Sequence, residues 1–102
     1  MKEWMDVLPE MDFPPGTSKT IHKDDIEVLV INLGGTFYGL EDCCSHDGNP
    51  LSGGEIDGGD IVCPRHGARF DIKTGAALSP PAYENINVLQ VRVSHGVIQI
   101  KR

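Results

Sequence analysis

The stretch from Cys44 to His66, CSHDGNPLSGGEIDGGDIVCPRH, decides how this chain of 102 residues is organised. It begins with a Cys-x-His pair, Cys44 and His46, and ends with a Cys-x-x-His pair, Cys63 and His66, with sixteen residues between the pairs. Two thiolates and two imidazoles suit a zinc ion or an iron–sulfur cluster, whereas calcium and magnesium require oxygen ligands. The spacing therefore predicts a metal centre held between two loops.

This pattern resembles that of Rieske proteins, in which two such pairs, separated by a gap of similar length, hold a [2Fe-2S] cluster. Residues 63–78, CPRHGARFDIKTGAAL, also resemble the second cluster loop and the following hairpin of Rieske ferredoxins. The resemblance runs from about Ile26 to the C-terminus. It implies that Cys44 and Cys63 hold the inner iron, which stays ferric. His46 and His66 would hold the outer iron, which accepts the electron.

Strand signals separated by glycine turns predict an all-β domain. Residues 26–33 (IEVLVINL) are β-branched and apolar at nearly every position, which indicates a strand buried on both faces. Gly34-Gly35 then predicts a tight hairpin turn before a strand at 36–40. Asp57-Gly58-Gly59-Asp60 predicts a similar turn between two short strands that would connect the ligand loops.

The C-terminal part repeats the hairpin pattern. Apolar residues alternate along 89–93 and along 98–100, and His95-Gly96 between them predicts a two-residue turn. Ser79-Pro80-Pro81-Ala82 cannot lie inside a strand, because proline lacks the backbone donor. This segment stands where Rieske proteins carry a proline loop over the cluster; the alternative is a rigid surface crossover.

The length favours a single Rieske domain, residues 1–102, because the chain is too short for two hydrophobic cores. The resemblance implies a Rieske-type antiparallel fold. Base sheets are expected at about 1–42 and 72–102, and a small cluster-binding subdomain at about 43–71.

Composition and charge exclude several classes of protein. The longest aliphatic run, 28–31, is far shorter than the roughly 20 residues of a membrane span. The first residues carry acids and prolines where a signal peptide has an apolar core, so a cytoplasmic location is expected. An unpaired Cys43 also fits a reducing compartment. A formal net charge of -6 disfavours nucleic acid as a partner and favours a basic protein surface.

The acids gather around the first ligand loop. No Lys or Arg occurs between Thr36 and Val62, where six acids lie: Glu41, Asp42, Asp47, Glu55, Asp57 and Asp60. They form either an electrostatic docking face or a set of solvated turns. The cations that follow, Arg65, Arg69 and Lys73, would orient a partner or offset these acids.

Three other residues compete as ligands. His22 lies in a polar, strand-like stretch and His95 in a turn, so both are expected to be exposed to solvent. Cys43 forms a second Cys-x-x-His spacing with His46, so a zinc site could use Cys43 in place of Cys44. The preferred interpretation is that Cys43 is a small, partly buried apolar residue at a strand end.

Differences from respiratory and photosynthetic Rieske proteins indicate which type of Rieske protein this chain resembles. Those proteins brace the two cluster loops with a disulfide at the positions of Asn49 and Arg65. They also direct serine and tyrosine hydroxyls at sulfur atoms from the positions of Ala68 and Phe70. Without these donors the reduction potential is expected near the low end of the Rieske range, roughly -150 mV. The chain thus resembles the soluble Rieske ferredoxins.

This resemblance implies a one-electron carrier that passes electrons from a flavin-containing reductase to the oxygenase of a ring-hydroxylating dioxygenase system. No nucleophile, general base or organic-substrate pocket is recognisable, so the chain is expected not to be catalytic on its own. It is expected to be a monomer with one [2Fe-2S] cluster and no membrane or nucleic-acid partner. Two alternatives stay open. One is the Rieske-like small subunit of an assimilatory nitrite reductase, which often lacks these ligands; the other is a structural zinc domain using the same four residues.

Overall fold

The computed structural model describes residues 3–23, 26–42, 51, 53–64, 67–80 and 84–101. Within these ranges the chain is built almost entirely of strands, which confirms the predicted all-β fold, and no helix is long and apolar enough to span a membrane. The elements in chain order are β1 (Met5–Pro9), the 3-10 helix η1 (Glu10–Asp12), β2 (Ser18–Lys23), β3 (Ile26–Leu33), β4 (Thr36–Glu41), β5 (Glu55–Asp57), β6 (Asp60–Val62), β7 (Arg69–Asp71), β8 (Val88–Ser94) and β9 (Val97–Lys101).

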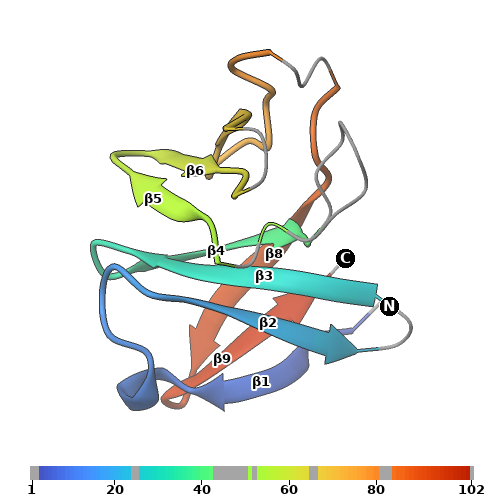
Figure 1. Cartoon of the computed structure of the whole chain (residues 1–102). Helices are drawn as coiled ribbons and strands as arrows, with labels where there is room; N and C mark the ends of the chain where they lie inside the picture. Colours follow the sequence, from blue (N-terminus) through green and yellow to red (C-terminus); the bar gives the residue numbers. More distant parts are fainter. Residues whose placement is uncertain are drawn as a thin grey trace.

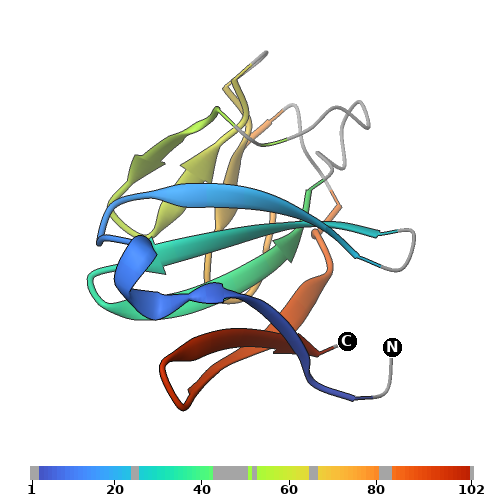
Figure 2. The same cartoon turned by 90° about the horizontal axis from the view of Figure 1, so that it is seen from below.

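Six strands form one antiparallel sheet in the order β1-β9-β8-β4-β3-β2. Strand β8 joins its two halves, because Val88 and Leu89 pair with β4 whereas residues 90–94 pair with β9. In Figure 1 the half formed by β2, β3 and β4 lies above the half formed by β1 and β9. The view from below shows β1 beside β9, which brings the first and last strands together (Figure 2).

Strand β3 separates two hydrophobic cores. Val28 and Val30 lie in the first core, whereas Leu29 and Ile31 lie in the second, and all four side chains are fully buried. The first core also contains Phe13, Ile98 and Ile100; the second also contains Leu40, Leu51, Ile61, Cys63, Ala68, Phe70, Ile72 and Ile86. Because successive strand residues point to opposite faces, a strand between two cores must be apolar on both. The prediction for residues 26–33 is confirmed.

The predicted turns are also confirmed. Gly34 and Gly35 both have positive φ angles, 64° and 98°, where β3 turns into β4. At the far hairpin His95 (φ 53°) and Gly96 (φ 77°) connect β8 to β9. Positive φ at both central residues is the geometry that matches the twist of paired strands.

The remaining strands form a small second sheet in the order β5-β6-β7. Its β5–β6 hairpin turns at Gly58, as predicted for residues 57–60. In Figure 1 this sheet lies above β4 and β3. It contributes Ile61 and Phe70 to the second core, beside Leu29 of β3. The small sheet is therefore fixed to the larger one through the core that contains Cys63.

Candidate metal centre

Of the four predicted ligands, Cys63 lies within the described residues; Cys44, His46 and His66 lie outside them, as does Cys43. The Cys63 side chain is 1% exposed and its thiol is free. Over the described ranges, no group of three or more His, Cys, Asp or Glu side chains could hold a metal ion. The ligand set therefore stays a prediction, and its surroundings are what the structure describes.

The second ligand loop is closed by its own backbone. The N–H of Gly67 donates to the carbonyl of Cys63 (3.0 Å), and the N–H of Cys63 donates to the carbonyl of Ala68 (2.7 Å). Gly67 has φ 74°, a conformation that favours glycine. The loop that carries His66 in the sequence thus begins at the end of β6 and ends at the start of β7, with its two ends hydrogen-bonded together.

The first ligand loop, residues 43–50, is flanked by Asp42 and Leu51. The backbone N–H of Leu51 donates to Oδ1 of Asp42 (2.6 Å), and Oγ1 of Thr20 donates to Oδ2 (2.8 Å). Asp42 is only 5% exposed and Leu51 is fully buried. The hypothesis of an acidic surface is therefore wrong for Asp42, because the strand end turns its carboxylate inward as a hydrogen-bond acceptor.

The chemistry at Cys63 fits an iron–sulfur cluster. A thiolate is the ligand that such clusters use, and its surroundings tune the potential of the metal. Ala68 and Phe70 are fully buried in the same core as Cys63. Their side chains offer no hydroxyl to a sulfur atom. The apolar surroundings of Cys63 agree with the prediction of a low potential.

Arg69 joins three segments around the second loop. Its Nη1 lies 2.9 Å from Oδ2 of Asp57 and 3.4 Å from Oδ2 of Asp60, on the β5–β6 hairpin. The hydrogen bond to Asp57 is the main cause that raises the pKa of Arg69 above its usual value. Its backbone bonds to Leu78 and Ser79. Of the two roles proposed for this cation, pairing with nearby acids is the one that the geometry supports.

The two remaining histidines are exposed, as predicted. The His22 side chain is 67% exposed, and its Nδ1 lies 3.7 Å from Oε1 of Glu27 on the neighbouring strand. His95 lies in the β8–β9 turn and is also exposed. Neither position suits a metal ligand shielded from water.

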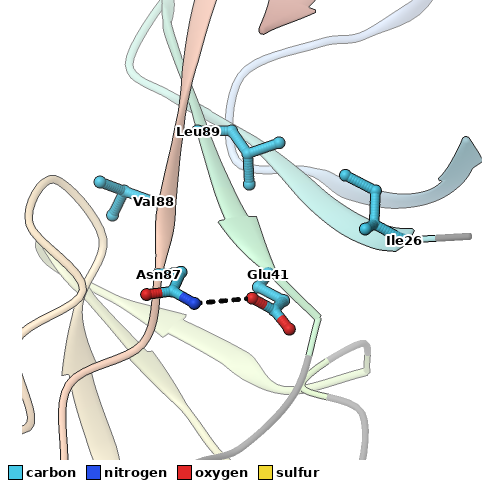
Figure 3. Close-up of a pocket in the computed structure, with 5 residues that line it drawn as sticks. All are labelled: Ile26, Glu41, Asn87, Val88 and Leu89. Carbon is cyan, nitrogen blue, oxygen red and sulfur yellow. Dashed lines mark hydrogen bonds between the residues drawn. The ribbon is translucent and has the colours of Figure 1, made fainter. Parts of the chain in front are cut away.

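A hollow of about 200 Å³ lies where β4 ends and β8 begins. Figure 3 shows the residues that line it, Ile26, Glu41, Asn87, Val88 and Leu89. Its two polar groups already pair, since Nδ2 of Asn87 donates to Oε2 of Glu41 (3.0 Å). The hollow is smaller than the roughly 300–1,000 Å³ of typical small-molecule sites.

Curated relatives match the chain over nearly its whole length. It is 34% identical to ferredoxin CarAc of Metapseudomonas resinovorans, with 95% of this chain and 92% of that protein covered. It is 37% identical to the 3-phenylpropionate/cinnamic acid dioxygenase ferredoxin subunit of Shigella flexneri serotype 5b (strain 8401), with 90% and 87% covered.

Solved structures have the same fold. One is a complex of reduced oxygenase and oxidized ferredoxin in carbazole 1,9a-dioxygenase, with a TM-score of 0.91 and 33% identity over 96% of this chain and 92% of the matched one. Another is the ferredoxin of carbazole 1,9a-dioxygenase from Nocardioides aromaticivorans IC177, with a TM-score of 0.92 and 28% identity over 96% of both chains. Residues 3–91 match the family described as the Rieske [2Fe-2S] domain. The chain therefore belongs to the Rieske [2Fe-2S] domain family.

Proposed function

We propose that this chain is a Rieske ferredoxin, a one-electron carrier between a flavin-containing reductase and the oxygenase of a ring-hydroxylating dioxygenase system. The single observation that carries the proposal is the match, over most of both chains, to a ferredoxin at 34% identity and to a dioxygenase ferredoxin subunit at 37% identity. The complex of oxygenase and ferredoxin among the matching structures supports an oxygenase as the electron acceptor. Catalysis on the organic substrate would belong to that partner.

The proposed ligands are Cys44 and Cys63 for the inner iron and His46 and His66 for the outer iron of one [2Fe-2S] cluster per chain. When bound, the cluster supplies the redox centre. The chain supplies thiolates, imidazoles and a core that excludes water from Cys63, which is 1% exposed. The cluster-binding subdomain is proposed at about 43–71 and the base at about 1–42 and 72–102. A cytoplasmic location and a monomeric state are part of the same proposal.

Metal content and colour distinguish this proposal from a structural zinc domain. We expect the purified protein to absorb visible light and to contain two iron and two sulfide ions per chain, as a [2Fe-2S] cluster requires. A colourless protein that contains zinc would overturn the proposal. Alanine at any of the four ligands should abolish the cluster, because each supplies one bond.

Cys43→Ser and Cys44→Ser form a matched pair for the first ligand loop. Cys43→Ser should keep the cluster and Cys44→Ser should lose it. The opposite result would show that the first loop uses Cys43.

Electron transfer distinguishes the proposal from the nitrite reductase alternative. The reduced protein should be reoxidised by a ring-hydroxylating oxygenase in the presence of its substrate and oxygen. It should in turn be reduced by a flavin-containing reductase with a nicotinamide donor. If it instead passed electrons to the large subunit of a nitrite reductase and to no oxygenase, the alternative would replace the proposal.

A further inference from the structure

We propose that Asp42 is the positioning residue of the first ligand loop: its carboxylate joins the two ends of residues 43–50. The inference rests on the proposed function, because it takes Cys44 and His46 within that loop as cluster ligands. Asp42 itself is not a ligand in this proposal. It acts through the backbone of the loop.

Two hydrogen bonds to the Asp42 carboxylate are short; the one from Leu51 is buried and the one from Thr20 is partly buried. Leu51, the first residue after the loop, donates its backbone N–H to Oδ1 at 2.6 Å. Thr20 donates its hydroxyl to Oδ2 at 2.8 Å. Asp42 is 5% exposed. Hydrogen bonds to a carboxylate are stronger than neutral ones, and exclusion of water strengthens them further. The start and the end of the loop are therefore held together at a single side chain.

Thr20 and Leu51 each belong to a well-packed part of the fold. Thr20 lies on β2, which pairs with β3 along its whole length, and the Asp42 N–H donates to the carbonyl of Glu27 on β3 (2.9 Å). Leu51 is fully buried in the second core with Cys63. The carboxylate thus connects the large sheet to the core around the second ligand loop.

This connection matters because the sequence lacks the two cysteines that form the disulfide brace between the ligand loops of braced Rieske proteins. Asn49 and Arg65 occupy the two positions at which braced Rieske proteins carry cysteines. A non-covalent contact would then take the place of that brace. The Asp42 carboxylate is placed to do so, since it joins the loop ends to each other and to the large sheet.

Three substitutions distinguish the effect of the hydrogen bonds from the effect of the charge. Asp42→Asn removes the charge, but its carbonyl can still accept from Leu51 and its amide can donate to the Thr20 hydroxyl. Asp42→Ala removes both bonds. Thr20→Val removes one bond and keeps the side-chain volume. Glu41→Ala is the matched control, because the neighbouring carboxylate also accepts a hydrogen bond, but from exposed Asn87 rather than from Leu51 or Thr20.

The test measures three properties of the purified holoprotein. They are the rate at which the visible absorption is lost to an iron chelator, the linewidth of the electron paramagnetic resonance signal of the reduced cluster, and the hydrogen exchange of the peptide containing the Leu51 amide. Asp42→Ala should lose its cluster about tenfold faster than wild type, as expected for loss of buried charged hydrogen bonds. Its signal should broaden and its Leu51 peptide should exchange faster.

The other variants have defined outcomes. Glu41→Ala should behave like wild type in all three measurements. Asp42→Asn, which keeps both bonds in neutral form, and Thr20→Val, which keeps one of them, should lose the cluster at rates between those of wild type and Asp42→Ala. Equal effects of Asp42→Ala and Glu41→Ala, or an unchanged signal in Asp42→Ala, would overturn the inference. An Asp42→Asn variant that loses its cluster as fast as Asp42→Ala would also overturn the inference, because the effect would then depend on the charge rather than on the hydrogen bonds.

Two further outcomes keep the test decisive. If Asp42→Ala does not fold, Thr20→Val must still lose its cluster faster than both wild type and Glu41→Ala; otherwise the inference fails. A wild-type protein without a cluster would instead refute the proposed function. In that case the exchange of the Leu51 peptide would still show whether Asp42 holds the loop ends.

Discussion

The side-chain oxygen of Ser79 accepts a hydrogen bond from the backbone N–H of Arg69 at 3.1 Å. One residue earlier, the N–H of Leu78 donates to the Arg69 carbonyl at 2.8 Å. Both backbone groups of Arg69 are therefore satisfied by the segment that leads into Pro80. The start of the proline segment is thus fixed to β7, which directly follows the second ligand loop.

Substitution Ser79→Ala should lower the free energy of unfolding by about 1 kcal/mol, because the partly buried Arg69 N–H loses its acceptor. Chemical denaturation of the holoprotein would measure this change. Ser94→Ala is the control, since that hydroxyl is exposed and interacts with its neighbour His95. Equal stability of both variants would show that the Ser79 bond contributes nothing.

Substitution Gly54→Ala should destabilise the fold by about 1–3 kcal/mol, the usual range for overpacking a closely packed site. A Cβ at this position would collide with the carbonyl oxygen of Val62 and lie 2.8 Å from that of Leu51. Thermal unfolding would measure the effect. Gly59→Ala should change stability by less than about 0.5 kcal/mol, because no atom lies within 4 Å of the added Cβ. A tolerated Gly54→Ala would mean that the loop after Leu51 can move away from β6.

The substitutions Ala68→Ser and Phe70→Tyr should raise the reduction potential. A donor to sulfur stabilises the reduced cluster more than the oxidised one, because reduction adds negative charge. Hydrogen bonds to charged groups contribute roughly 1.5–3 kcal/mol, and about half of that should distinguish the two redox states. Each donor should then add about 30–70 mV to a wild-type value of roughly -150 mV, as measured by protein-film voltammetry.

Crystal structures of these variants supply the control. Both native side chains are fully buried beside Cys63, so a hydroxyl that fails to reach sulfur would be buried without a partner and would lower stability instead. A potential that stays constant although the hydroxyls contact sulfur would contradict the prediction. So would a wild-type potential near the top of the Rieske range.

Reversing charges near the first loop should slow electron transfer to the oxygenase if acids guide docking. Among the described acids, Glu55 is exposed on β5, whereas Asp57 and Asp60 already pair with Arg69. We expect Asp47→Lys with Glu55→Lys to reduce the rate at low salt and to flatten its dependence on ionic strength, since screening at ~0.15 M limits exposed charges to about 8 Å.

A charge reversal elsewhere is the matched control for docking. Glu10 is exposed in η1, which lies beside β1 at the bottom of Figure 1 and away from β5. Glu10→Lys changes the net charge but should leave the salt dependence close to that of wild type. Stopped-flow kinetics with the separate proteins would compare them. A wild-type rate that does not respond to salt would leave these acids as ordinary solvated surface.

Local patterns in the sequence predicted most of the strands. Residues 26–33 are apolar on both faces because β3 lies between two cores. Burial on both faces can therefore be recognised from an unbroken run of apolar residues. Gly34-Gly35 and His95-Gly96 predicted their turns because positive φ angles restrict the residues that fit. The spacing of the two Cys/His pairs likewise predicted the family, to which residues 3–91 match.

Other features depend on contacts between distant segments. Strand β1 was not predicted, because its short sequence forms a strand only by pairing with β9. Gln99 of β9 donates to Asp6 of β1 at 2.7 Å, although the two residues lie near opposite ends of the sequence. Asp42 looked like one of six surface acids. Only the tertiary structure turns it inward, because Thr20 and the Leu51 amide meet at its carboxylate once β2, β4 and the second core have come together. The sequence thus determined the family and the proposed ligands, and the tertiary structure decided which residues lie around them.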